Sequence, residues 1–101
     1  MAILYKTDST IENVYPREGK IFSYEELQDF VREGSDDMIE IVPMPSGRYI
    51  VVNEEGKLIG LKTNLRATDV WKAEYPIYKY PHNNDELIVG NALVCEASEI
   101  D

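Results

Sequence analysis

Short apolar runs with many β-branched residues, each stopped by proline, glycine or other turn residues, dominate the sequence and restrict the folds that it can adopt. Adjacent runs are joined by turns and do not alternate with helices, so the strands should pair as hairpins. The predicted strands are Ala2 to Lys6, Thr10 to Tyr15, Met38 to Val42, Tyr49 to Asn53, Lys57 to Leu61 and Glu86 to Glu96, the last with a bulge at Gly90. The tail, residues 97–101, should fray.

Two helices are expected between these strands. Ser23 followed by Glu26 forms a capping box, and apolar residues then recur at helical spacing, which predicts a main helix over residues 23–33. Asn64 or Thr68 can cap a shorter helix. The sequence therefore predicts the α+β class, with an antiparallel or mixed sheet of about six strands and with one main helix and one short helix packed on one face.

The chain is short enough to limit both its domain count and its location. With 101 residues it can bury one hydrophobic core, so residues 1–101 are expected to form a single domain. No apolar run approaches the roughly 18 residues that cross a bilayer, and Lys6 directly follows the first apolar run. We therefore expect no membrane segment and no signal peptide, and a cytoplasmic protein.

Acidic residues outnumber basic ones and are unevenly placed. The formal net charge of -9 repels phosphate backbones and anionic membranes, so general nucleic-acid binding and membrane binding are not expected. Acidic residues concentrate in residues 23–40, where they form either a solvated helix face or a surface that imitates a phosphate backbone and binds a basic groove of another protein. The candidate protein-binding residues are Glu25, Glu26, Asp29, Glu33, Asp36 and Asp37.

A second candidate site lies where basic residues predominate. A helix start that carries an arginine and a threonine is a natural anion site, although Asn64 or Thr68 could merely cap the helix while Trp71 fills the core. If the tyrosine-rich loop of residues 75–82 lies beside this helix, aromatic faces and cationic groups would line a pocket suited to a nucleotide. The candidate ligand-binding residues are Asn64, Arg66, Thr68, Lys72, Tyr75, Tyr78 and Tyr80.

The sequence contains no recognisable catalytic or metal-binding constellation. Glu54 and Glu55 are neighbours in a turn, where their carboxylates point apart and are solvated. His82 lies among oxygen-bearing residues that lack the spacing of a calcium loop, and there is no second histidine for zinc. Cys95, the only cysteine, lies in an apolar run that indicates a buried small hydrophobe. We therefore expect no enzyme, no metal and no cofactor.

Three short motifs carry a resemblance to a known family. They are N-E-E-G-K at residues 53–57, N-x-x-A-T at residues 64–68 and I-V-G-N at residues 88–91. With their neighbours, over roughly residues 19–94, they resemble an uncharacterised domain family of small proteins carried by bacteriophages and conjugative elements, domain of unknown function 3846. The resemblance implies a phage or mobile element inside a bacterial host cell, and it transfers no active site. Ser35, Asp36 and Asp37 depart from the family pattern by extending the acidic segment.

Three functions follow from these observations. The leading hypothesis is a non-enzymatic binding protein of a phage or mobile element, with counter-defence as one role, that acts on a host protein through its acidic surface. The alternative is sequestration of a nucleotide-derived small-molecule signal in the pocket lined by arginine, lysine and tyrosine, in the form of a homo-oligomer. A structural or maintenance protein of the element is the third.

Overall fold

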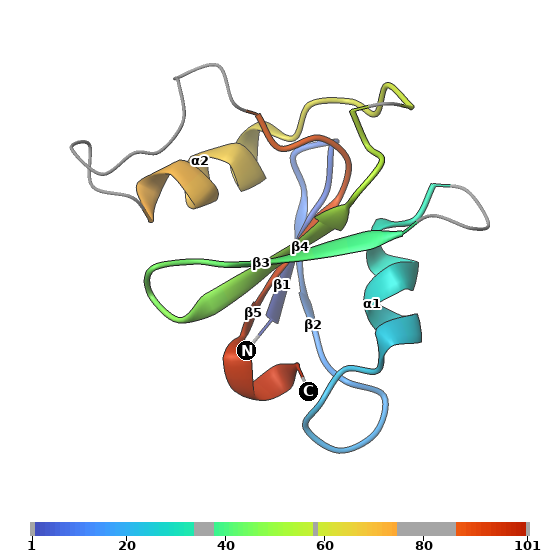
Figure 1. Ribbon diagram of the computed structural model, residues 1–101, viewed down its shortest axis with the longest axis vertical. Helices are drawn as coiled ribbons and strands as arrows, with labels where there is room; N and C mark the ends of the chain where they lie inside the picture. Colours follow the sequence, from blue (N-terminus) through green and yellow to red (C-terminus); the bar gives the residue numbers. More distant parts are fainter. Residues whose placement is uncertain (1, 34–37, 58, 75–86, 101) are drawn as a thin grey trace.

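A single antiparallel sheet with one helix on either side forms the centre of the molecule (Figure 1). The computed structural model describes residues 2–33, 38–57, 59–74 and 87–100. The strands are β1 (Ala2–Tyr5), β2 (Ile11–Val14), β3 (Ile39–Pro43), β4 (Arg48–Asn53) and β5 (Ala92–Glu96), and the helices are α1 (Tyr24–Val31), α2 (Leu65–Ala73) and the short 3₁₀ helix η2 (Ala97–Glu99). The α+β class is confirmed, with five strands among the described residues where about six were expected.

The strand order is β2-β1-β5-β4-β3, so the last strand in the chain lies at the centre of the sheet. β1 and β2 form one antiparallel hairpin, and β3 and β4 form another. β5 lies between the hairpins and pairs antiparallel with each of them, and its residue Val94 lies opposite Ile3 on one side and Ile50 on the other. The edges of the sheet are therefore β2 and β3.

The two helices cover opposite faces of this sheet. Leu27 of α1 packs in one core cluster with Leu93, whereas Trp71 of α2 packs in a second cluster with Val94. Neighbouring residues of a strand point to opposite faces, so these two clusters lie on the two sides of β5. The prediction that both helices pack on one face is wrong. The apolar run that forms β5 is buried on both faces, which is typical of a central strand covered on each side.

The strand predicted over Lys57 to Leu61 is wrong for the residues of that range that the structure describes. The N–H of Ile59 donates to Glu55 O at 3.0 Å, and the N–H of Leu61 donates to Gly56 O at 2.9 Å. These bonds close turns instead of pairing with β4. The physical reason is that β3 and β5 already occupy both edges of β4, so no edge is left for a returning strand.

The last strand is shorter than the predicted range of residues 86–96 because the segment before it bonds elsewhere. Gly90 has a positive φ of 76°, and its N–H donates to Lys62 O at 2.7 Å. Val89 forms an isolated bridge with Thr63. Residues 88–90 therefore pair with the segment before α2, and pairing begins only at Ala92 with β1 and at Leu93 with β4.

The predicted fraying of the tail is wrong for residues 97–100. They form η2 and then return to the start of α1, where the N–H of Phe22 donates to Glu99 O at 2.8 Å. Ile100 is half-buried and packs against the cluster on the α1 side of the sheet. An apolar residue near the end of the chain thus holds this segment in place. None of the described helices is long and apolar enough to cross a membrane.

Candidate functional site

The side-chain amide of Asn64, proposed above as a ligand-binding residue, forms hydrogen bonds to the protein's own backbone. It is 1% exposed and caps α2, with its Oδ1 accepting from the N–H of Ala67 at 3.0 Å. Its Nδ2 donates to Tyr5 O and to Gly90 O, each at 2.9 Å. One amide group therefore joins the start of α2, the end of β1 and the segment before β5.

Thr68 completes this internal junction. Its hydroxyl donates to Asn64 O at 2.8 Å and accepts from the N–H of Ile88 at 2.9 Å. The N-x-x-A-T and I-V-G-N motifs therefore meet in space, and the side chains of Asn64 and Thr68 bond to backbone groups of Gly90 and Ile88. Capping was one of the two interpretations of these residues from the sequence. The bonds to Ile88 and Gly90 could not be deduced, because they join segments that are distant in the chain.

The other residues proposed for a nucleotide pocket do not gather around this junction. Arg66 is exposed and Lys72 is half-buried on α2. Six residues of helix separate them by about 120° around its axis, so they lie on different faces. The remaining proposed ligands, Tyr75, Tyr78 and Tyr80, lie outside the residues that the structure describes.

Glu26, expected on the outer face of α1, turns inward. It is 8% exposed, and its carboxylate accepts from the N–H of Ser23 at 3.2 Å and from the N–H of Arg17 at 2.9 Å. Ser23 Oγ accepts from the N–H of Glu26 at 3.1 Å, which confirms the predicted capping box. The same capping geometry explains why the prediction that Glu26 is a surface residue is wrong, since the box draws the side chain back to the helix start.

The remaining acidic surface of α1 is partly compensated by arginines. Asp29 forms ion pairs with Arg32 at 2.6 Å and with Arg17 at 3.3 Å. Glu25 and Glu33 are exposed. Two further proposed contact residues, Asp36 and Asp37, lie outside the described part of the chain. The acidic face of the helix is thus smaller than the sequence indicated.

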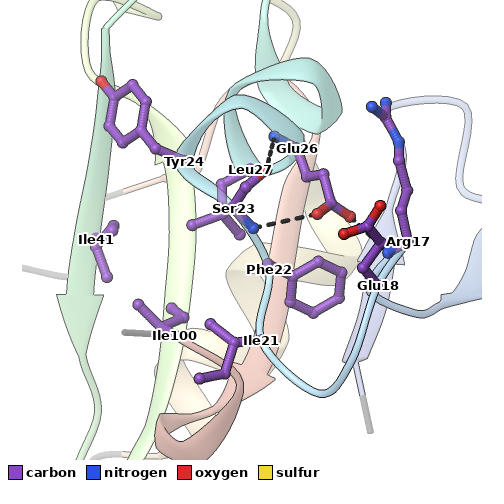
Figure 2. A pocket seen from close by; sticks show the side chains of 10 residues that line it. All are labelled: Arg17, Glu18, Ile21, Phe22, Ser23, Tyr24, Glu26, Leu27, Ile41 and Ile100. Atoms are coloured by element: carbon purple, nitrogen blue, oxygen red, sulfur yellow. Dashed lines mark hydrogen bonds between the residues drawn. The ribbon is translucent and has the colours of Figure 1, made fainter.

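A hollow of about 620 Å³ lies at the start of α1, bordered by β3 and the end of the chain. Figure 2 shows that apolar side chains form one side of it and charged ones the other. Ile21 and Tyr24, on its apolar side, are 46% and 54% exposed. The lining residues are Arg17, Glu18, Ile21, Phe22, Ser23, Tyr24, Glu26, Leu27, Ile41 and Ile100.

This hollow could not be predicted from the sequence because three distant segments build it. Residues 17–27 supply the helix start, Ile41 comes from β3, and Ile100 follows η2. No local pattern indicated it, because Tyr24 is one of the apolar residues at helical spacing, which predict burial.

The bonds at Glu26 predict a loss of stability in acid. The N–H groups of Arg17 and then of Ser23 stabilise its carboxylate and hold its pKa below the usual 4.5. A lowered pKa in the folded state means that Glu26 stabilises the fold above about pH 4.5 and ceases to do so as the pH falls through the folded pKa. The free energy of unfolding, measured by urea denaturation between pH 7 and 3, should therefore fall less steeply in Glu26→Gln than in the wild type below about pH 4.5.

The matched control for this prediction is Glu25→Gln, which removes the same charge at an exposed position of α1. Its profile should keep the shape of the wild-type profile. If both variants follow the wild type equally below pH 4.5, the bonds from Arg17 and Ser23 do not stabilise the ionised form.

A second bonded carboxylate connects α2 to the turn between β3 and β4. Glu74 accepts from the N–H and the hydroxyl of Ser46, each at 3.0 Å, and forms an ion pair with Arg48. Burial raises the pKa of Glu74, but the hydrogen bonds from Arg48 and Ser46 together outweigh burial, so the pKa lies below its usual value.

Cys95 is fully buried, and burial raises the pKa of its thiol to about 12.

Among residues 2–33, 38–57, 59–74 and 87–100, no group of three or more His, Cys, Asp or Glu side chains is placed to hold a metal ion.

The family model described as a domain of unknown function (DUF3846) matches residues 3–101. No curated protein and no solved structure matches the chain. The family match contains the motifs that meet around Asn64 and both sides of the hollow at the start of α1. The chain belongs to the DUF3846 family.

Proposed function

We propose that this protein is a non-enzymatic binding protein that contacts another protein through the hollow at the start of α1. The observation that carries the proposal is the exposure of Ile21 and Tyr24 at the rim of that hollow, beside Ile41 and Ile100. Exposed apolar side chains grouped around a depression are typical of protein interaction sites. A tyrosine at the rim is well suited to this role, because it offers large apolar area and a polar end.

The charge of the protein supports a basic partner. Its net charge is -9, and the charged side of the hollow carries two glutamates, Glu18 and Glu26, against one arginine, Arg17. Opposite charges speed the encounter of two proteins and exclude partners of like charge. In our proposal the partner is a host protein in a bacterial cell that carries a phage or mobile element, and the role is counter-defence.

The shifted pKa values favour binding over catalysis. Glu26 and Glu74 have lowered pKa values, so their carboxylates stay ionised near neutral pH and bonded to their own fold. A general acid or base needs a pKa near the working pH. The buried thiol of Cys95, with a pKa raised to about 12, stays protonated, whereas a nucleophilic cysteine needs a lowered pKa. These three groups are therefore unsuited to acid–base or nucleophilic chemistry.

The nucleotide-binding alternative has less support. Asn64 and Thr68 were two of its proposed ligands, and their side chains bond to the protein's own backbone. A nucleotide would have to displace those bonds, and buried polar groups are costly to leave without partners.

Site-specific photo-crosslinking tests the proposed contact surface. A photoreactive phenylalanine analogue in place of Tyr24 should crosslink one protein in bacterial lysate, and the same analogue in place of Leu65 should not. Leu65 is the matched control because it is 66% exposed on α2, on the other face of the sheet. The binding of the purified crosslinked partner should then weaken about 30-fold in Tyr24→Ala, as expected for an aromatic side chain central to an interface.

Two results would contradict the proposed surface. One is equal crosslinking from positions 24 and 65, which indicates non-specific association. The other is a partner whose affinity is unchanged in Tyr24→Ala and in Ile21→Asp, a variant that places a charge at the apolar rim of the hollow.

A further inference from the structure

Strand β3 forms an edge of the sheet, and its backbone is arranged to accept another strand. Among the described residues its only strand neighbour is β4. The N–H of Met44 donates to Arg48 O and the N–H of Glu54 donates to Met38 O, each at 2.9 Å. Backbone groups alternate in direction along a strand, so the even-numbered residues between these bonds face β4. The odd-numbered residues Ile39 and Ile41 therefore direct their N–H and C=O groups away from the sheet.

Pro43 agrees with this register. It lies within β3, opposite Tyr49, at an odd-numbered position where an N–H would point away from β4. Proline is tolerated in an edge strand at such positions because no bond to the neighbouring strand is lost. Pro43 also limits the open stretch, so the available donors are the N–H groups of Ile39 and Ile41.

The two faces beside this edge differ in chemistry. Ile41 lies on the α1 face and lines the hollow there with Tyr24. Glu40 is exposed on the opposite face, where Glu54 lies close by in the lining of a second hollow that also contains one basic residue, Lys57. Among the described residues no ion pair involves Glu40 or Glu54. A strand added beside β3 would place alternate side chains on these two faces.

We propose that β3 binds an extended segment of a partner protein by strand addition, and that the segment alternates apolar and basic residues. Its apolar side chains enter the hollow beside Ile41, and its basic side chains lie next to Glu40 and Glu54. Backbone hydrogen bonds at Ile39 and Ile41 hold it in register. This inference rests on the proposed function, since it describes how the partner occupies the same hollow.

The other edge strand is less suited to this role. β2 exposes Ile11, Glu12 and Asn13, and Glu12 forms an ion pair with Lys6 at 3.0 Å. The Glu12 carboxylate is therefore already paired and less available to a basic segment added at this edge. β3 has no such ion pair among its described residues, and its edge adjoins exposed apolar side chains.

A basic partner is favoured over a second copy of this chain. Two copies paired through β3 would each bring a charge of -9, and pairing centred on Ile41 would place the two Glu40 side chains diagonally across the junction. Like charges across a strand pair are destabilising. A segment with lysine or arginine beside Glu40 replaces that repulsion with attraction.

Selection of peptides by the full-length protein tests the proposal. The protein is immobilised and selects from a displayed library of random octapeptides, and the enriched sequences are synthesised. We expect apolar and basic residues to alternate in the enriched sequences. Bound peptide should slow amide hydrogen exchange at Ile39 and Ile41 by about tenfold or more, while Glu40 and Val42, whose N–H groups already face β4, should change little.

Two variants separate the backbone and charge contributions. Ile41→Pro removes an outward N–H and no bond to β4, and it should weaken peptide binding by about tenfold or more. Glu40→Lys should weaken binding by about the same factor. Asp69→Lys, the same charge change at an exposed position of α2, should leave it unchanged. If Ile41→Pro does not fold, hydrogen exchange in the wild-type protein still decides the outcome.

Several results would overturn strand addition. They are the absence of enriched peptides, unchanged exchange at Ile39 and Ile41 with peptide bound, and equal effects of Glu40→Lys and Asp69→Lys. Formation of a dimer protected at the same two amides would assign the edge to a second copy instead. A partner that crosslinks at position 24 and binds Ile41→Pro normally would sustain the proposed function while excluding strand addition.

Discussion

Replacement of Asn64 by leucine is expected to lower the free energy of unfolding by about 4 kcal/mol, since each unsatisfied buried polar group costs about 1–3 kcal/mol. Leucine is similar in size but cannot bond, so it removes the partner of the buried C=O of Gly90 and of the buried N–H of Ala67, together with the part-buried bond to Tyr5 O. The measurement is urea denaturation at pH 7, with the midpoint and slope fitted separately.

Two variants calibrate this result. Asn64→Asp keeps an acceptor for the N–H of Ala67 but places a carboxylate against two carbonyl oxygens, so it should also be destabilised. Arg66→Ala changes an exposed residue of the same helix and should cost less than about 0.5 kcal/mol. If Asn64→Leu remained within that range too, the proposed junction between α2, β1 and the segment before β5 would be wrong.

Truncation of the residue that anchors each helix should produce the other large effect. Leu27→Ala and Trp71→Ala are each expected to cost about 3 kcal/mol or more, because each leaves a cavity in a separate core cluster. The costs should add, because the clusters lie on opposite faces of the sheet and share no side chain. Urea denaturation of the milder pair Leu27→Val and Trp71→Phe, singly and combined, measures additivity in a chain that remains folded.

A coupling of more than about 0.5 kcal/mol between those two substitutions would contradict the arrangement. It would indicate that both helices share one core, as expected had they packed on one face. Leu65→Ala, an exposed residue of α2, controls for changes in helix stability alone.

The features that could be predicted from the sequence are those with local causes. Ser23 and Glu26 are three residues apart, and their capping box marks the start of α1 within one residue. Short turns connect the strands of each hairpin, so β1 with β2 and β3 with β4 were expected as neighbours. Each of these elements depends on residues that are close together in the chain.

The features that could not be predicted depend on residues far apart. Lys57 to Leu61 has the composition of a strand, but it cannot pair with β4. The edge of β4 that it would need is occupied by β5, a segment some thirty residues later in the chain. The hollow needs Ile100 beside Ile41, and no local pattern relates the two. Glu26 is a similar case, because its bond to the N–H of Arg17 withdraws it from the surface.

The candidate sites divide in the same way. Asn64 and Thr68 have side chains that suit either a ligand or a helix start, and only their partners in the fold distinguish the two roles. Residue type alone therefore gave two interpretations. Ile21 and Tyr24 are a different case. Their apolar side chains next to a capping box suggest core packing, but both are exposed in the structure.

The central position of β5 affects how fast this protein can fold. Each hairpin can form from contacts between near neighbours, but the sheet remains in two halves until the last strand inserts between β1 and β4 and brings Val94 to Ile3. Pairing across such chain separations requires closure of large loops, and folding becomes slower as the share of such non-local contacts rises. Until β5 inserts, each half exposes an unpaired inner edge and apolar side chains, so other chains can compete for the place of β5. Low protein concentration during refolding should therefore increase the yield of native protein.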